Sequence, residues 1–295
     1  MPELIEVEMY RRDLDALVGL PVESVELQDE RAIRPKGTPE DIMEVLLGMT
    51  LSRTLRHGKL LIAVFVDPPL NRPFRRHGET EGCGVVDPPL NRPFRRHGET
   101  EGCGVSLGVR FGMTGRLLID GNSCIEHLEY SSKRNDPAWD RFALSLGGHR
   151  MVLRDQRCLG SVELDPELAG LAPDAATLTT EQLSAAFAGR SKAIKSALLD
   201  QTIVAGLGNL LADEVLWAVG LSPLRPVDTL ASARLEHLAS QIRKTVQELG
   251  ARGGSHTGAS FPLRHEGASC ARCSGSMRRD RVGGRTAWWC STHQV

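Results

Sequence analysis

Four metal-ligating side chains are grouped near the C-terminal end of the sequence. Cys270 and Cys273 are separated by two residues, and after sixteen more residues Cys290 and His293 form a second pair with the same separation. Two close pairs of thiolate and imidazole donors are typical of tetrahedral zinc sites. We therefore predict that these residues hold one structural zinc ion, against the alternative that the thiols are unrelated.

Glycines and arginines occupy the segment between the two pairs, RRDRVGGRT at 278–286. The glycine pair suits the tip of a β-hairpin, where positive φ angles are needed, and arginine side chains bind phosphate. The pattern predicts a zinc-held β-hairpin that contacts nucleic acid. A zinc site with a purely structural role is the alternative.

The first residues of the chain, MPELIE, contain a candidate nucleophile. Methionine before a small residue is normally excised, which leaves Pro2 as a secondary amine at the chain end. An α-amino group titrates near pH ~8, so a useful fraction is unprotonated at neutrality and able to attack an electrophilic carbon. A helix N-terminus disfavours the cation further. The alternative is that Pro2 only begins a helix, a position that proline favours.

A glycine-rich turn at 201–209, QTIVAGLGN, separates two helical stretches. Such a turn presents backbone N–H groups and the Asn209 amide to a phosphate. Lys195, at the end of the preceding stretch, lies within reach of the same phosphate. An ordinary connection between helices has a similar composition, so this motif carries weight only together with the others.

The elements that position these motifs follow from hydrophobic periodicity. A stripe through Leu4, Val7, Leu14 and Leu17 predicts a helix at 3–18. Short alternating or apolar runs from about 22 to 160 predict strands. An alanine- and proline-rich linker near 163–178 precedes helical segments at 180–199 and 210–219, and glycines then lead into the cysteine-rich tail.

The predicted fold class is α+β and multidomain. It comprises an N-terminal helix plus β-sandwich at 1–165, a helical domain at 175–250 and a zinc-finger β-hairpin at 260–295. Residues 66–85 recur unchanged at 86–105, which indicates a recent tandem duplication. We expect this segment to be a solvated insert between two strands, without a catalytic role. Its arginines fit a solvated charge cluster better than a DNA contact: Arg72, Arg75, Arg76, Arg92, Arg95 and Arg96.

Composition narrows the class of protein. Apolar residues make up 41% and charged residues 25%, as in soluble globular proteins, and no apolar run approaches the ~20 residues of a membrane helix. Carboxylates near the start, where a secretory signal is basic, predict a cytoplasmic protein. Seven cysteines favour metal ligation in a reducing compartment over a disulfide framework. The net charge of −1 means that any nucleic-acid surface is local.

Taken together and in this order, the three motifs resemble the formamidopyrimidine-DNA glycosylase and endonuclease VIII family over nearly the whole chain apart from the insert. The start is similar to the family's Met-Pro-Glu-Leu-Pro-Glu-Val-Glu and departs at Ile5. The resemblance implies that Pro2 attacks the anomeric carbon of a damaged nucleotide, that Glu3 opens the sugar ring by giving and taking protons, and that Glu6 places water or the base. The iminium then acts as an electron sink for β- and δ-elimination of the flanking phosphates.

The same resemblance assigns further site residues. Lys59, in HGKLL, matches a family lysine that binds phosphate or the flipped base. Met113, in RFGMTG, matches the side chain that fills the space left by base flipping, which offsets part of the cost of extrusion. The remaining assignments are Arg157 and Leu159 as partners of that methionine, Lys195 and Asn209 as phosphate ligands of a helix–two-turns–helix module, Arg285 as the hairpin arginine, and His293 in place of the usual fourth zinc cysteine.

The sequence thus predicts a base-excision repair enzyme, a DNA glycosylase with abasic lyase activity whose catalytic residues are Pro2, Glu3, Lys59 and Arg285. Its expected partner is double-stranded DNA with damaged bases or abasic sites, bound by a monomer, in the nucleoid if the source is bacterial. One alternative is an inactive damaged-DNA-binding protein of the same fold, which the retained Pro2, Glu3 and Lys59 disfavour. Another is a tautomerase-like enzyme, in which the zinc motif and the Asn209 turn have no purpose.

Lesion choice follows from the length of one segment. In the family's formamidopyrimidine branch, a long loop closes over everted 8-oxoguanine. This loop lies between the last helix of the helix–two-turns–helix module and the zinc finger. Here only residues 255–269 lie between the glycine-rich connection and Cys270. An open pocket weakens hydrogen bonds to a flipped base, so we expect 8-oxoguanine to be a poor substrate beside hydantoins, formamidopyrimidines or oxidised pyrimidines.

Overall fold

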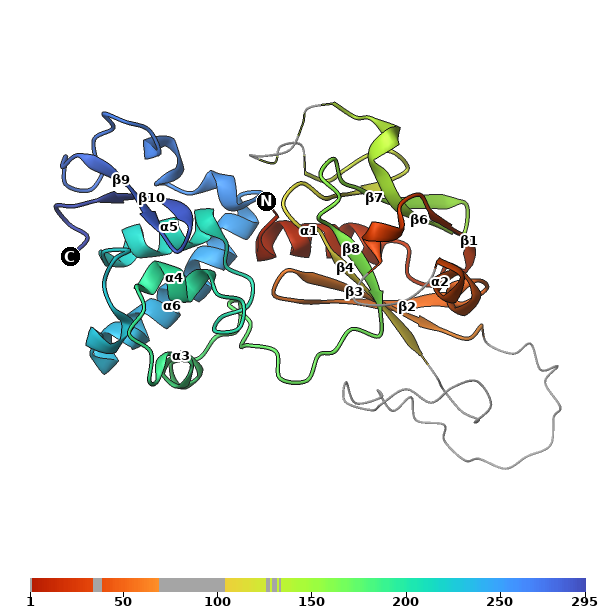
Figure 1. Cartoon of the computed structure of the whole chain (residues 1–295), viewed down its shortest axis with the longest axis horizontal. Coiled ribbons are helices and arrows are strands. Elements are labelled where there is room, and N and C mark those ends of the chain that lie inside the picture. Colours follow the sequence, from red (N-terminus) through yellow and green to blue (C-terminus); the bar gives the residue numbers. More distant parts are fainter. Residues whose placement is uncertain (1, 34–38, 69–103, 126–127, 129–131, 133) are drawn as a thin grey trace.

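The computed structural model describes residues 2–33, 39–68, 104–125, 128, 132 and 134–295. The chain forms two lobes, and its N-terminus lies between them (Figure 1). One lobe contains two β-sheets, and the other contains helices and the C-terminal hairpin. The α+β class with a sandwich, a helical module and a hairpin bearing a Cys/His cluster is confirmed. No helix in these ranges is long and apolar enough to cross a membrane.

The sandwich lobe consists of two four-stranded antiparallel sheets. The first has the order β1-β6-β7-β5, and the second β2-β3-β4-β8. Apolar side chains that alternate along the strands fill the space between the sheets. The strands are β1 (Val22–Leu27), β2 (Thr50–His57), β3 (Leu60–Val66), β4 (Val105–Arg110), β5 (Arg116–Ile119), β6 (Asp140–Leu146), β7 (His149–Arg154) and β8 (Ser161–Leu164).

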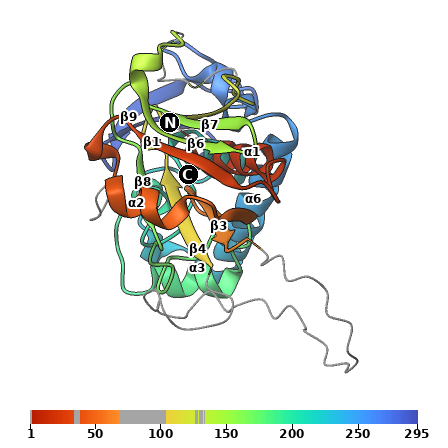
Figure 2. The same cartoon turned by 90° about the vertical axis from the view of Figure 1, so that its right-hand side faces the viewer.

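Helix α2 (Pro39–Leu46) was not expected from the sequence, where residues 22–160 suggested strands alone. A proline at its first position and two acidic residues in its first turn favour a helix start. With β1 it lies on the side of the sandwich lobe that faces away from the helical lobe (Figure 2). The duplicated segment connects β3 to β4, and its arginines lie outside the described residues.

The helical lobe contains α3 (Thr180–Phe187), α4 (Ile194–Leu199), α5 (Asn209–Val219) and α6 (Ser232–Ala251). The sequence suggested one helical stretch from 180 to 199. The structure divides it at Gly189, whose φ of 69° a glycine adopts without strain. The 3-10 turns are η1 (Glu30–Ala32), η2 (Pro137–Trp139), η3 (Val227–Thr229), η4 (Ser255–Thr257) and η5 (Phe261–Leu263).

Helix α1 (Leu4–Asp15) joins the two lobes, because its buried side chains belong to both cores. Leu4 and Ile5 pack with the apolar side chains of α3 to α6, whereas Val7, Tyr10 and Leu14 pack between the sheets. The first turn of α1 therefore lies against the helical lobe. This places the carboxylates of that turn at the junction.

The C-terminal hairpin pairs β9 (Met277–Val282) with β10 (Arg285–Cys290) in antiparallel register. Val282 pairs with Arg285, so Gly283 and Gly284 alone form the turn, with φ angles of 58° and 74°. Two successive positive φ angles are the geometry of a type I′ turn. The predicted hairpin with the glycine pair at its tip is confirmed.

Candidate active site

Glu3 is fixed where the two lobes meet. Its Oε1 accepts a hydrogen bond from the backbone N–H of Leu210 (2.8 Å), and its Oε2 accepts from those of Gly208 (2.9 Å) and Leu211 (3.1 Å). The carboxylate that precedes α1 thus caps the N-terminus of α5, where unpaired N–H groups favour an acceptor. Pro2, the adjacent residue, is buried at the same junction.

Burial sets the proton affinity of Glu3. It raises the pKa of Glu3 from its ordinary 4.5 to about 7, and the charge of Glu6 adds to the rise. The ammonium of Lys59 and the N–H groups of α5 oppose the rise without cancelling it. A carboxyl group with a pKa near neutrality both donates and accepts protons under physiological conditions.

Close backbone approach keeps the Glu3 carboxylate in place. A Cβ atom on Gly208 would lie 2.3 Å from the carboxyl carbon of Glu3, so a larger residue there would displace the carboxylate or the backbone. Gly206, with a φ of 108°, accepts the backbone N–H of Leu4 at 3.1 Å. The glycines of the turn at 201–209 therefore allow the start of α1 to touch the start of α5.

Glu6 forms a second link across the junction. Its Oε2 accepts the backbone N–H of Glu3 (2.8 Å), and its Oε1 accepts both the N–H (2.7 Å) and the hydroxyl (2.6 Å) of Ser255. Glu6 is 3% exposed. These contacts make Glu6 a positioning group that ties the first turn of α1 to the segment after α6.

Lys59 lies at the tip of the β2–β3 hairpin, which is clamped onto the linker between the lobes. Gly58 donates its N–H to Asp174 (2.6 Å). Arg56 pairs with the same carboxylate (2.6 Å) and donates to the Gly58 carbonyl (2.9 Å). A Cβ atom on Gly58 would lie 2.8 Å from that of Ala205. No local pattern indicated this contact, because Arg56 and Asp174 are distant in the chain.

Lys59 interacts electrostatically with three other predicted site residues, Glu3, Glu6 and Arg285. Burial lowers the pKa of Lys59, the nearby carboxylates of Glu3 and Glu6 oppose this effect, and the guanidinium of Arg285 adds to it. Arg285 is exposed beside the hairpin tip. An amine with a lowered pKa next to a proton-exchanging carboxyl is an arrangement suited to covalent and acid–base catalysis.

The position of Lys195 does not fit the role predicted for it. Its side chain is fully buried, and its ammonium donates to Asp213 (2.6 Å) and to the carbonyl oxygen of Thr286 (2.7 Å). A phosphate contact would require breaking this buried ion pair, which is costly. We therefore correct the expectation that Lys195 is a phosphate ligand. The residue instead connects α4 and α5 to the hairpin.

Asn209 begins α5, as expected from the turn that precedes it. Its side-chain oxygen is buried and has no hydrogen-bond partner within the described ranges. An amide oxygen is an acceptor, so this atom can pair only with a donor, and a phosphate would instead be bound through the N–H groups of the same amide. The phosphate contact predicted for Asn209 stays a prediction.

The three residues expected to replace a flipped base form one group on the sandwich lobe. The guanidinium of Arg157 lies 3.6 Å from the sulfur of Met113. Leu159 is 40% exposed although it is a large apolar residue. A Cβ atom on Gly112 would lie 2.6 Å from the carbonyl carbon of Leu159, so the two loops are in direct contact.

The four predicted metal ligands converge at the base of the hairpin. Donor atoms of Cys270, Cys273, Cys290 and His293 all lie within 4.8 Å of one another, with 3.3 Å between Cys270 Sγ and His293 Nδ1 and 3.4 Å between the other two sulfurs. Zinc bonded at about 2.3 Å to sulfur and about 2.0 Å to nitrogen separates tetrahedral ligands by similar distances. The cluster is therefore suited to a metal ion.

Neighbouring groups orient these donors. Nε2 of His293 lies 3.1 Å from the carbonyl oxygen of Trp217, which leaves Nδ1 directed at the cysteines. The sulfur of Cys270 accepts from the Trp217 indole N–H and from the Arg272 backbone, both at 3.4 Å. Such outer contacts fix the tautomer and direction of a metal-ligating histidine.

Two family descriptions cover most of the sequence. The formamidopyrimidine-DNA glycosylase N-terminal domain matches residues 1–162, and the formamidopyrimidine-DNA glycosylase H2TH domain matches residues 169–260. The chain belongs to the formamidopyrimidine-DNA glycosylase family.

Individual members of this family match the chain from end to end. The formamidopyrimidine-DNA glycosylase of Parasynechococcus marenigrum (strain WH8102) is 32% identical over 321 residues, with 100% of each chain covered. That of Paracoccus denitrificans (strain Pd 1222) is 31% identical, with 98% of each chain covered. The predicted family is confirmed.

Solved structures share the fold. The LlFpg protein in complex with a THF-DNA and an inhibitor has a TM-score of 0.74 at 23% identity, with 100% of each chain covered. The complex between Lactococcus lactis Fpg and DNA containing an abasic site has a TM-score of 0.71 at 21% identity, with 99% of each chain covered. The two-lobed arrangement of this chain is the arrangement of that fold.

The segment at 255–264, between α6 and the zinc finger, is held along its length by hydrogen bonds and an ion pair. Besides the contacts of Ser255 with Glu6, the carboxylate of Glu214 accepts the N–H groups of Ala259 (2.9 Å) and Ser260 (2.8 Å). Arg264 pairs with Asp213. Sequence reasoning missed Asp213 and Glu214, which resemble ordinary helix residues until their burial in α5 is seen.

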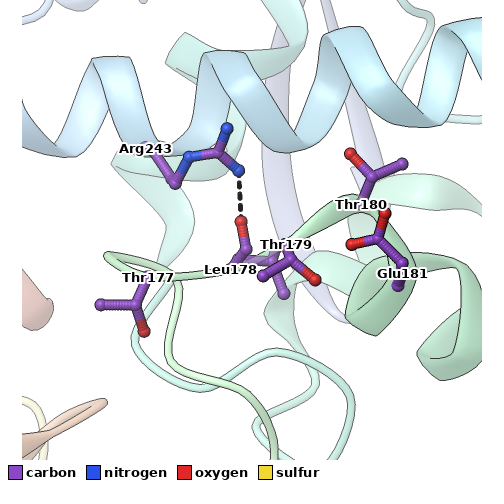
Figure 3. A pocket seen from close by; sticks show the side chains of 6 residues that line it. All are labelled: Thr177, Leu178, Thr179, Thr180, Glu181 and Arg243. Carbon is purple, nitrogen blue, oxygen red and sulfur yellow. Dashed lines mark hydrogen bonds between the residues drawn. The ribbon is translucent and has the colours of Figure 1, made fainter.

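A separate cavity of about 270 Å³ lies between the start of α3 and the side of α6 (Figure 3). Threonines and Glu181 line it, and Arg243 donates to the carbonyl oxygen of Leu178 across it. Thr179 already caps α3 by accepting from Gln182. None of the predicted site residues contributes to this cavity.

Proposed function

We propose that the amine of Pro2 carries out both base excision and strand cleavage in this DNA-repair glycosylase. Family membership makes the chain a DNA glycosylase whose partner is DNA with damaged bases or abasic sites. The observation that carries the proposal is the Glu3 carboxyl beside Pro2, buried on the N-terminus of α5 with a pKa raised to about 7.

The chemistry follows from these positions. The unprotonated amine of Pro2 attacks C1′ of the damaged nucleotide, and the base departs with the electron pair of the glycosidic bond. The attacking nitrogen loses its proton and the departing base gains one, so the nitrogen regains a lone pair. Glu3 gives a proton to the sugar-ring oxygen, and the ring opens to an iminium. That cation withdraws electrons from C2′, so a proton is lost there and the 3′ phosphate leaves. Loss of the 5′ phosphate by δ-elimination completes the cleavage.

Lys59 and Arg285 support this chemistry by their charge. Lys59 lies close to the carboxylates of Glu3 and Glu6, and Arg285 lies close enough to Lys59 to lower the pKa of its ammonium. We propose that both hold the phosphates next to the lesion by their charge and that Lys59, whose ammonium can lose a proton, also protonates a departing group. All of these residues belong to one chain, so the site is complete in a monomer.

Cys270, Cys273, Cys290 and His293 are proposed to bind one structural zinc ion. A bound zinc ion would crosslink the base of the hairpin, because all four tetrahedral positions are filled by protein. With the hairpin held, Arg285 remains beside Lys59 and Asn209 remains at the start of α5. We propose that Asn209 contacts a DNA phosphate there.

The proposed lesions are ring-opened, hydantoin or oxidised-pyrimidine bases rather than 8-oxoguanine. The segment at 255–264 is bound to α1 and α5 by Glu6, Glu214 and Asp213, so it is not free to fold over an everted base. Single-turnover cleavage of matched duplexes is the test. A rate on 8-oxoguanine opposite cytosine equal to that on the other lesions would contradict this preference.

The products of cleavage test the main proposal. A duplex with one hydantoin lesion should yield a single-nucleotide gap with phosphate at both ends, because β- and δ-elimination remove the sugar. The Glu3→Gln variant should release the base far more slowly, since an amide has no carboxyl proton to exchange. Tight binding of the lesion duplex by the unmodified chain without cleavage would instead support an inactive damage-recognition protein.

A further inference from the structure

Asp155, directly after β7, makes an unusual number of contacts for one side chain. It is fully buried. Its Oδ2 accepts the backbone N–H groups of Leu159 and Gly160, each at 2.6 Å, and its Oδ1 accepts that of Arg157 at 3.1 Å. The hydroxyl of Thr114 also donates to Oδ1. A carboxylate has about four acceptor positions, and these four donors occupy them.

These contacts connect two segments that are far apart in the sequence. Thr114, itself 2% exposed, follows Met113 in the turn between β4 and β5. Arg157 and Leu159 belong to the loop between β7 and β8. One carboxylate therefore holds the backbone of the loop and, through Thr114, the turn that presents Met113.

The base of this loop is fixed as well. The N–H of Asp155 donates to the carbonyl oxygen of Trp139 (2.8 Å), and Arg141 donates to the carbonyl oxygen of Asp155 (2.8 Å). Cys158 has a φ of 50°, and its thiol donates to Asp29 (3.3 Å). The loop thus has a single defined shape, while Leu159 and Arg157 remain exposed at its surface.

We infer that Asp155 is a positioning residue that holds Met113, Arg157 and Leu159 as one rigid wedge for base extrusion. The inference rests on the proposed function, in which these three side chains fill the gap left by the flipped base. A loop that is ordered before DNA binds loses no conformational freedom on insertion. Asp155 acts through the two loops that it holds, so its effect should be confined to substrates that must be extruded.

Comparing paired and unpaired substrates tests the inference. The full-length Asp155→Asn variant keeps the shape of the side chain. Its amide NH2 group is a donor, however, and it would face a backbone N–H or hydroxyl that needs an acceptor. We expect its kcat/KM on a hydantoin in duplex DNA to fall by about 10- to 100-fold, as for a misplaced contact. On the same lesion in single-stranded DNA, where no extrusion is needed, the change should be within about threefold. Thr114→Val removes only the link to the Met113 turn. It should lower the ratio of kcat/KM on duplex DNA to kcat/KM on single-stranded DNA, but by less than Asp155→Asn.

Asp140→Asn is the matched control, because Asp140 is also buried in the sandwich but forms its ion pairs with Arg150 and Arg154 of strand β7. It should leave the duplex-to-single-strand ratio unchanged. Equal losses on both substrates for Asp155→Asn, or a shifted ratio for Asp140→Asn, would overturn the inference in favour of general destabilisation. A wild-type chain that cleaves neither substrate would overturn the proposed function and this inference with it.

Discussion

The Cys/His cluster draws its donors from one short stretch, residues 270–293, whereas the junction around Glu3 draws on segments from the whole chain. The cluster depends on spacing within a hairpin and a turn. The junction depends on α1, the β2–β3 turn, the start of α5, Ser255 and the hairpin tip meeting in space. The cluster is therefore sensitive to loss of its ligands, and the junction is sensitive to small displacements.

Removing a metal ligand has the largest expected effect. Cys273→Ser should lose zinc and the ordered hairpin, because metal binding and folding of such a site are one equilibrium worth on the order of 10 kcal/mol. Strand cleavage should then be abolished, because the hairpin backbone no longer packs against Lys195 and Asp213, next to the helix α5 whose start holds Glu3. Metal analysis alongside cleavage assays checks this, with Cys124→Ser, an exposed thiol outside the cluster, as the control. A folded, active and metal-free Cys273→Ser protein would contradict the zinc proposal.

The second largest effect is expected from adding one methyl group at the junction. Gly208→Ala places a Cβ atom against the Glu3 carboxylate, so one of them must move. A displacement of about 1 Å at a catalytic group costs on the order of 100-fold in rate. The control is Gly250→Ala in α6, where the nearest atom is 3.9 Å from the added carbon. Equal single-turnover rates for the two variants would show that the Gly208 contact does not position Glu3.

The pKa of Glu3 predicts how stability depends on pH. The Glu3 carboxyl has a pKa of 4.5 in the unfolded chain and of about 7 in the folded chain. Between these values the folded state binds more protons, so stability falls as pH rises. Relative to Glu3→Gln, the unmodified chain should lose about 3 kcal/mol between pH 4 and 8. Urea unfolding of both proteins across this range measures the difference, and parallel pH profiles would show that Glu3 has an ordinary pKa.

Arg285 should give the smallest of these effects. Its side chain is exposed, so Arg285→Ala removes one charge without disturbing the core. Binding should weaken across all lesion types, and the slope of log affinity against log salt should decrease by about one phosphate contact. Arg279→Ala, at another exposed arginine of the hairpin, is the comparison. An unchanged salt slope for Arg285→Ala would place this side chain away from the phosphates.

The sequence predicted those features that depend on local pattern. The α1 helix with its first-turn carboxylates, the hairpin with its glycine pair and the four metal ligands all follow from spacing. Features that depend on contacts between distant residues were missed or wrong. Lys195 was expected to face a phosphate but is buried against Asp213. Asp155 and Asp174 gave no local signal, because their roles arise only where separate loops meet.

The central claim is that Pro2, and not a lysine, forms the covalent link to DNA. Lys59 is the competing nucleophile, since its amine lies near the same carboxylates and burial lowers its pKa. The decisive measurement is reduction of the reacting complex with borohydride, followed by mass spectrometry of the DNA-linked peptide. We expect a chain that begins at residue 2 and carries the DNA on the nitrogen of Pro2. Attachment at Lys59 or at any other internal lysine would contradict it.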